Sequence, residues 1–83
     1  MEKLEIQVPE EILISLKESS QEFSKHILLL AAIKLYELGK LSTEVAAQLA
    51  GIPKVTFLRL LSNYNVPIFD LTMEELNKDL EHV

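Results

Sequence analysis

Eight side chains between residues 40 and 63 are of the types that bind DNA. Lys and Arg neutralise backbone phosphates, and Arg, Asn, Ser and Thr also form hydrogen bonds to base edges in the major groove. The candidates are Lys40, Ser42, Thr43, Lys54, Thr56, Arg59, Ser62 and Asn63. A nucleic-acid interface is therefore the chemistry that this stretch predicts.

These candidates fall into two groups by position. The first three precede or open a predicted helix whose N-terminal amides could help them to hold a phosphate, although helix capping is the favoured role of Ser42. The other five lie on the outer face of the next predicted helix, which Val55 and Leu58 interrupt. Because apolar side chains are costly to leave in water, this helix either reads DNA with low specificity or is partly buried against protein.

The same sequence offers little for catalysis. It has no cysteine and two isolated histidines, His26 and His82. Glu22 could pair with His26 one helical turn later, but a surface contact is commoner than a catalytic base. The acids that crowd residues 74–81 could suggest a metal site, but a solvated helix face explains their spacing. We therefore predict a protein that is not an enzyme and needs no metal or cofactor.

The spacing of residues 43–62 is that of a helix-turn-helix, in which two helices cross closely at a tight turn. Gly51 would be the left-handed turn residue, and Ala47 would lie at the crossing four residues earlier. The other inward positions are apolar: Ala46, Ala50, Ile52, Phe57 and Leu60. We therefore expect helices over residues 44–50 and from residue 54 to about residue 64.

Residues 3–8 alternate between polar and apolar types, which predicts a half-buried strand with Leu4, Ile6 and Val8 on one face. A strand needs a partner, and the candidate is a second short strand within residues 66–69, in the same chain or across a dimer. Pro9 is then well placed to open a short helix that ends near Ser19.

A longer helix follows. Ser19 and Glu22 have the spacing of a capping box, and Gly39 is placed to end the helix after Leu38. This helix is apolar on nearly all sides, so it is either the spine of the monomer or has one side against a second copy. Thr72 and Glu75 form another capping box, which opens a last helix.

The sequence thus predicts a mainly α fold, a helix-turn-helix domain with a short N-terminal β-strand. One domain spans residues 1–83, with a strand in 1–9, a helical core or dimerisation part in 10–40, the helix-turn-helix in 41–66 and an acidic tail helix in 67–83. A domain of 83 residues is marginal alone. Without cysteines, oligomerisation is the stabilising device that remains, so we expect a homodimer.

The net charge of −5 is unevenly distributed. Residues 25–66 sum to +3, whereas residues 1–24 and 67–83 each sum to −4. This asymmetry suggests two partners of opposite charge, although solvated acidic faces give the same count. The longest uncharged apolar run, residues 27–33, is too short to span a membrane, and no signal-peptide pattern opens the sequence. We expect a cytoplasmic protein.

Three stretches carry a family resemblance: residues 29–42, 46–52 and 57–61. They resemble a family of small uncharacterised prokaryotic proteins described as predicted antitoxins containing a helix-turn-helix. The likeness extends from the strand before Pro9 to the acidic C-terminal end. It implies an antitoxin that neutralises a toxin resembling a PIN-type ribonuclease and that represses its own operon.

Within that role, the acidic end predicts contact with the toxin. Met73, Leu76 and Leu80 form an apolar stripe flanked by the carboxylates of Asp70 and Asp79. Such a stripe suits a groove in a partner, with the carboxylates facing a basic RNA-binding cleft. Packing of this helix on its own domain is the other interpretation. We expect a DNA-binding antitoxin, and the alternative is a protein-protein interaction module that uses the helix-turn-helix scaffold without DNA.

Overall fold

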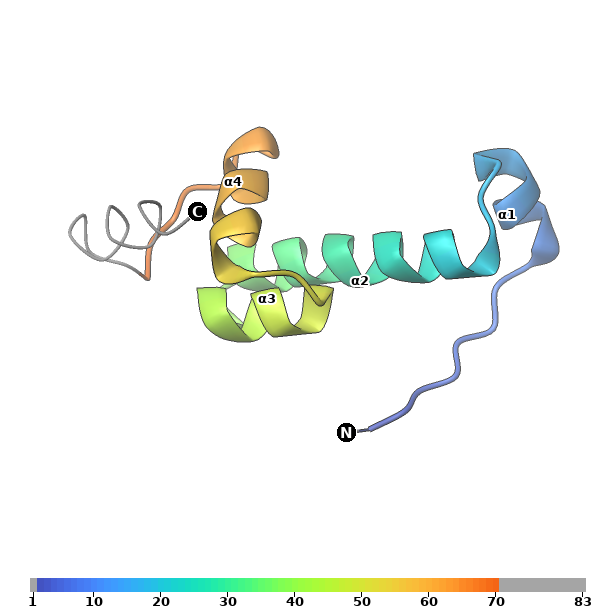
Figure 1. Cartoon of the computed structure of the whole chain (residues 1–83), viewed down its shortest axis with the longest axis horizontal. Coiled ribbons are helices and arrows are strands. Elements are labelled where there is room, and N and C mark those ends of the chain that lie inside the picture. Colours follow the sequence, from blue (N-terminus) through green and yellow to red (C-terminus); the bar gives the residue numbers. More distant parts are fainter. Residues whose placement is uncertain (1, 71–83) are drawn as a thin grey trace.

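The computed structural model describes residues 2–70 and is mainly helical, as predicted. Its helices are α1 (Glu10–Leu16), α2 (Ser20–Glu37), α3 (Thr43–Ala50) and α4 (Lys54–Asn63). Figure 1 shows α2 as the long central helix, with α3 and α4 against its C-terminal half and α1 at its other end. The predicted last helix lies outside the described residues. No helix within residues 2–70 is long and apolar enough to cross a membrane.

The start of α2 follows directly from its sequence. The Ser19 hydroxyl accepts a hydrogen bond from the Glu22 amide at 3.1 Å, and the Glu22 carboxylate accepts one from the Ser19 amide at 3.0 Å. The predicted capping box is therefore confirmed. The helix ends at Glu37, one residue before the predicted end, and Gly39 follows in the left-handed conformation with φ +76°. In α1, Leu16 is the last helical residue, three residues before the predicted end, and left-handed Lys17 follows it as the C-cap.

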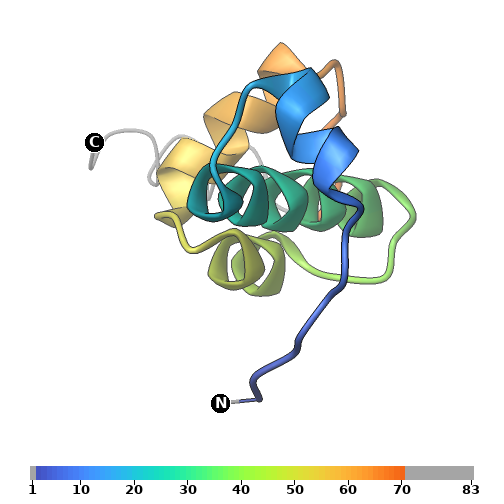
Figure 2. The same ribbon diagram turned by 90° about the vertical axis from the view of Figure 1, so that its right-hand side faces the viewer.

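Residues 3–8 form no strand in the single chain, and Leu4 and Ile6 remain 81% and 68% exposed. Pairing within the chain fails because the candidate mate is held elsewhere. Val66 is buried in the core and Phe69 stacks on Tyr36 near the C-terminal end of α2. The N-terminal segment instead leads into α1 at the opposite end of α2, and it points away from the helices in both ribbon views (Figures 1 and 2).

The hydrophobic core lies at one end of the molecule. Its members are Ala32, Ile33, Tyr36, Ala46, Ala47, Phe57, Leu58, Leu61 and Val66. They come from the second half of α2, from α3 and α4, and from the segment after α4. In Figure 2, which looks along α2, α3 and α4 flank neighbouring sides of α2. Within residues 2–31, no side chain is buried. The core therefore holds α3 and α4 against α2, and α1 contributes no side chain to it.

Gly51 should be a sensitive turn residue. It ends α3 with φ +71°, and an added Cβ would meet nothing within 4 Å, so the cost of a side chain is conformational. We expect Gly51→Ala to lower the free energy of unfolding by about 1 kcal/mol, measured by urea denaturation. Gly51→Asn should lose less stability than Gly51→Ala, because Asn tolerates the left-handed conformation. A Gly51→Ala protein as stable as the original would contradict this account.

Candidate nucleic-acid interface

The pair formed by α3 and α4 is organised around a three-residue turn. Ser42 caps α3 by accepting a hydrogen bond from the Val45 amide at 3.3 Å, and Pro53 directly precedes α4. The small side chains of Ala46 and Ala47 are buried, which lets the helices approach closely. Phe57 of α4 is fully buried against this unit. The predicted pair of helices around Gly51 is therefore present, with boundaries within one residue of those expected.

The outer face of α4 is polar. Thr56, Arg59, Ser62 and Asn63 are all exposed. The first, second and last of these recur at spacings of three and four, so they form one stripe along the helix. Lys54 is less accessible, because its side chain is 27% exposed and its ammonium lies 3.4 Å from the Glu44 carboxylate.

The expectation that Val55 and Leu58 interrupt this outer face is corrected. Leu58 is 2% exposed and belongs to the core, together with Leu61, while Val55 is half-buried. The helix turns Phe57, Leu58 and Leu61 inward as one group. The apolar side chains that would have been costly in water are thus buried or half-buried. The exposed face carries groups that can donate and accept hydrogen bonds.

The start of α3 is not an open anion site. The Thr43 amide donates a hydrogen bond to the Asp70 carboxylate at 2.6 Å, and the Thr43 hydroxyl donates to the same carboxylate. Thr43 is 1% exposed. Its predicted role at a phosphate is therefore corrected: the chain's own carboxylate occupies the amide. Ser42 caps the helix, and Lys40 lies exposed just before it.

The Asp70 carboxylate accepts hydrogen bonds within the chain, and its predicted contact with a partner stays a prediction. Besides Thr43, it accepts a hydrogen bond from the Tyr36 hydroxyl at 3.0 Å. Burial raises the pKa of Asp70, but the bonds from Thr43 and Tyr36 outweigh this effect and bring the pKa below its usual value. The other predicted partner-binding residues, Met73, Leu76, Asp79 and Leu80, lie outside the described residues.

Tyr36 is the residue that the sequence analysis missed. It is fully buried, its ring packs edge-on against Phe57 at 6.1 Å, and Phe69 stacks on it at 4.5 Å. Its hydroxyl accepts a hydrogen bond from the Phe69 amide at 2.9 Å. Burial raises the pKa of the Tyr36 hydroxyl, so it stays protonated and donates to Asp70. The sequence could have indicated its burial, because Tyr36 lies one helical turn after Ala32 and both residues share the inward face of α2.

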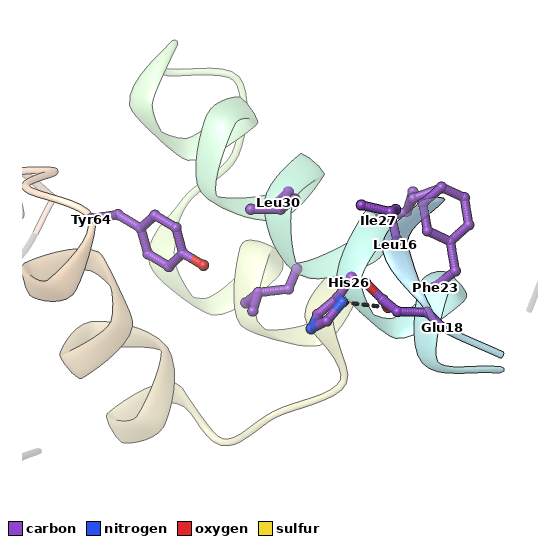
Figure 3. Close-up of a pocket in the computed structure, with 8 residues that line it drawn as sticks. Leu16, Glu18, Phe23, His26, Ile27, Leu30 and Tyr64 are labelled. Atoms are coloured by element: carbon purple, nitrogen blue, oxygen red, sulfur yellow. Dashed lines mark hydrogen bonds and ion pairs between the residues drawn. The ribbon is translucent and has the colours of Figure 1, made fainter. Parts of the chain in front are cut away.

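A second candidate region is a groove of about 270 Å³ beside the first half of α2. Figure 3 shows its apolar lining, with Leu16, Phe23 and Ile27 on one side, Tyr64 on the other and Leu30 between them. His26 Nδ1 lies 2.6 Å from the Glu18 carboxylate at its edge. The suggested Glu22 and His26 pair is thus replaced by His26 and Glu18. Within residues 2–70, no group of three His, Cys, Asp or Glu side chains could hold a metal ion.

The arrangement defines a small helical protein with a helix-turn-helix pair at one end. At the other end lies an apolar arm, which consists of residues 3–8, α1 and the first half of α2. The chain belongs to the uncharacterised protein family UPF0175, whose family model matches residues 1–83. A UPF0175 protein from Aeropyrum pernix is 35% identical over 79 residues, which cover 95% of this chain and 83% of the relative. No solved structure matches the chain. The resemblance to a family of small uncharacterised proteins is therefore confirmed.

Loss of the Asp70 carboxylate should destabilise the protein. Asp70→Asn leaves the Thr43 and Tyr36 groups with a poorer acceptor, and we expect about 0.5–1.5 kcal/mol less stability at pH 7, measured by urea denaturation. Glu2→Gln, which alters an exposed acid, should have no effect.

The pH dependence of this difference follows from the lowered pKa of Asp70. Its stabilisation is complete well above the ordinary value of 3.8 and is lost as the pH falls through the lower folded-state pKa. The stability gap between the original protein and Asp70→Asn should therefore narrow below about pH 4. A gap that stays constant down to about pH 2 would show that the ionised carboxylate is not the source.

Proposed function

We propose that this protein is a DNA-binding antitoxin that represses its own operon and neutralises a toxin resembling a PIN-type ribonuclease. The observation that carries the DNA-binding part is the polar outer face of α4, held by the buried face of the same helix. A rigid helix with exposed hydrogen-bonding side chains is what major-groove recognition requires.

The residue types on this face support base contact. An arginine such as Arg59 can bond guanine through two hydrogen bonds, and an asparagine such as Asn63 can do the same with adenine. Thr56 lies on the same exposed stripe. Lys40 and Ser42 precede α3 and suit phosphate contacts, which position a protein on DNA without reading the sequence. Ser62 and Lys54 flank the stripe as further contacts.

Dimerisation is part of the proposal. Two copies that present α4 about 34 Å apart would bind two half-sites one helical turn apart on one side of the duplex. A net charge of −5 gives little non-specific attraction to phosphate. A basic toxin bound to the acidic C-terminal residues would offset this charge, so toxin and operator binding should reinforce each other. DNA and ribonuclease targets both place this activity in the cytoplasm.

One observation favours the second candidate function, a protein-protein interaction module without DNA binding. Large apolar side chains remain exposed on or beside the helix-turn-helix pair, among them Leu30, Leu38 and Val45 at 50%, 57% and 46%. Apolar patches of this kind mark protein contacts. They are compatible with the antitoxin proposal, in which the same chain contacts protein and DNA through different faces.

Arg59→Ala should weaken binding to the DNA upstream of the protein's own gene. We expect a loss of about 1–3 kcal/mol, or about 5- to 150-fold in Kd, measured by fluorescence anisotropy at fixed salt. The matched control is Lys25→Ala, which removes one exposed positive charge on α2 and should change affinity little. Equal losses for both variants would show that α4 is not the DNA-reading surface, and no binding by the original protein would favour the interaction module.

The antitoxin part is tested with the product of the neighbouring gene. Binding of the protein to its upstream DNA should weaken with salt and tighten when that product is added. The double variant Leu76→Ala with Leu80→Ala should abolish the tightening and lose affinity for the product in calorimetry, while DNA binding of the protein alone persists. Unchanged affinity of the variant for the product would overturn the predicted contact.

A further inference from the structure

Half of the described chain has no core of its own. All buried side chains of residues 2–70 lie from Ala32 onward, although the preceding segment is rich in large apolar residues. Leu4, Ile6, Ile14 and Leu16 are between 50% and 81% exposed. A surface of this kind marks an interaction site, and it continues into the open groove beside the first half of α2.

The segment of residues 3–8 has the pattern of a strand but no mate. Its apolar residues Leu4, Ile6 and Val8 alternate with polar ones, so they share one face of an extended chain. The segment forms no ladder with any other described segment. Pairing with residues 66–69 of the same chain does not occur, because Phe69 stacks on Tyr36 while residues 2–9 lead into α1, which joins the start of α2 at Ser19. Those two points on α2 are about 25 Å apart along the helix.

We infer that a second copy of this chain supplies the missing strand, and that residues 3–8 of the two copies form a two-stranded antiparallel ribbon. This inference deepens the dimer of the proposed function and does not depend on DNA or toxin. A twofold axis makes such a contact self-complementary, because each copy presents the same segment to the other. The ribbon pairs one backbone edge of each strand with the other copy.

The side chains select one register. With Ile6 facing Ile6 of the second copy, Leu4 faces Val8 and Glu5 faces Gln7, so every apolar residue meets an apolar one. A shift that sets Glu5 against Glu5 places like charges opposite each other, which is destabilising. A shift that sets Leu4 against Leu4 leaves Val8 unpaired. Ile6 on the twofold axis is therefore the register that charge and apolar matching favour.

In this register, three apolar side chains from each copy line one face of the ribbon. Two strands alone are not stable in water and need a cover. The exposed apolar residues of α1 and of the first half of α2, such as Ile14 and Leu28, provide that cover in both copies. The ribbon and these helix faces together form a second core, shared between the two chains.

Disulfide capture tests the register directly, because the chain contains no cysteine. Residues that face each other in an antiparallel pair have Cα atoms about 4.5–5.5 Å apart, within the range that a disulfide bridges. Ile6→Cys should form a covalent dimer almost completely under mild oxidation. Leu4→Cys, the matched control on the same face, should not, because the two Leu4 positions are offset by about 13 Å along the strands.

Capture at position 4 above that at position 6, or equal capture at both, would overturn the register. Sedimentation equilibrium of the original protein without DNA or partner provides the second measurement. We expect a dimer, which Ile6→Lys converts to a monomer with its helical circular dichroism retained in part, while Gln7→Lys on the opposite face remains a dimer. A monomeric original protein, or an Ile6→Lys variant that remains a dimer, would overturn the ribbon.

Discussion

The contacts of Tyr36 hold the described domain together. Its ring packs between Phe57 of α4 and Phe69 of the exit segment, and its hydroxyl bonds both the Phe69 amide and the Asp70 carboxylate. Asp70 in turn binds both the amide and the hydroxyl of Thr43 at the start of α3. One buried side chain on α2 thus connects every other element of the core. A buried hydroxyl needs such partners, since an unsatisfied one is costly.

This arrangement decides which surfaces are available. The position at the α3 N-terminus that would suit a phosphate is filled by a carboxylate from the same chain, so the proposed DNA contacts shift toward α4. There the core takes up Leu58 and Leu61, and the side chains left outside are polar. The exposed stripe of α4 is therefore a consequence of how tightly its inner face packs on α3 and α2.

The part of the described chain before Ala32 has no buried side chains. The capping box of Ser19 and Glu22 makes α2 a continuous helix, but only its second half meets α3 and α4. The first half, α1 and the N-terminal segment keep their apolar side chains exposed. The arm has enough apolar residues for a second core, but no other described part of the chain covers them. We therefore infer that a second copy covers them.

Local patterns in the sequence were sufficient for the helices. Capping residues, Gly51 in its left-handed turn and the small residues Ala46 and Ala47 specify where helices begin, end and cross, because these effects act within a few residues. Only the tertiary structure decided the side on which Leu58 lies, the central role of Tyr36 and the use of Asp70 inside the chain. Those outcomes depend on contacts between residues more than 20 positions apart, which no local spacing encodes. The failure of residues 3–8 to form a strand has the same origin, since a strand exists only when a partner is present.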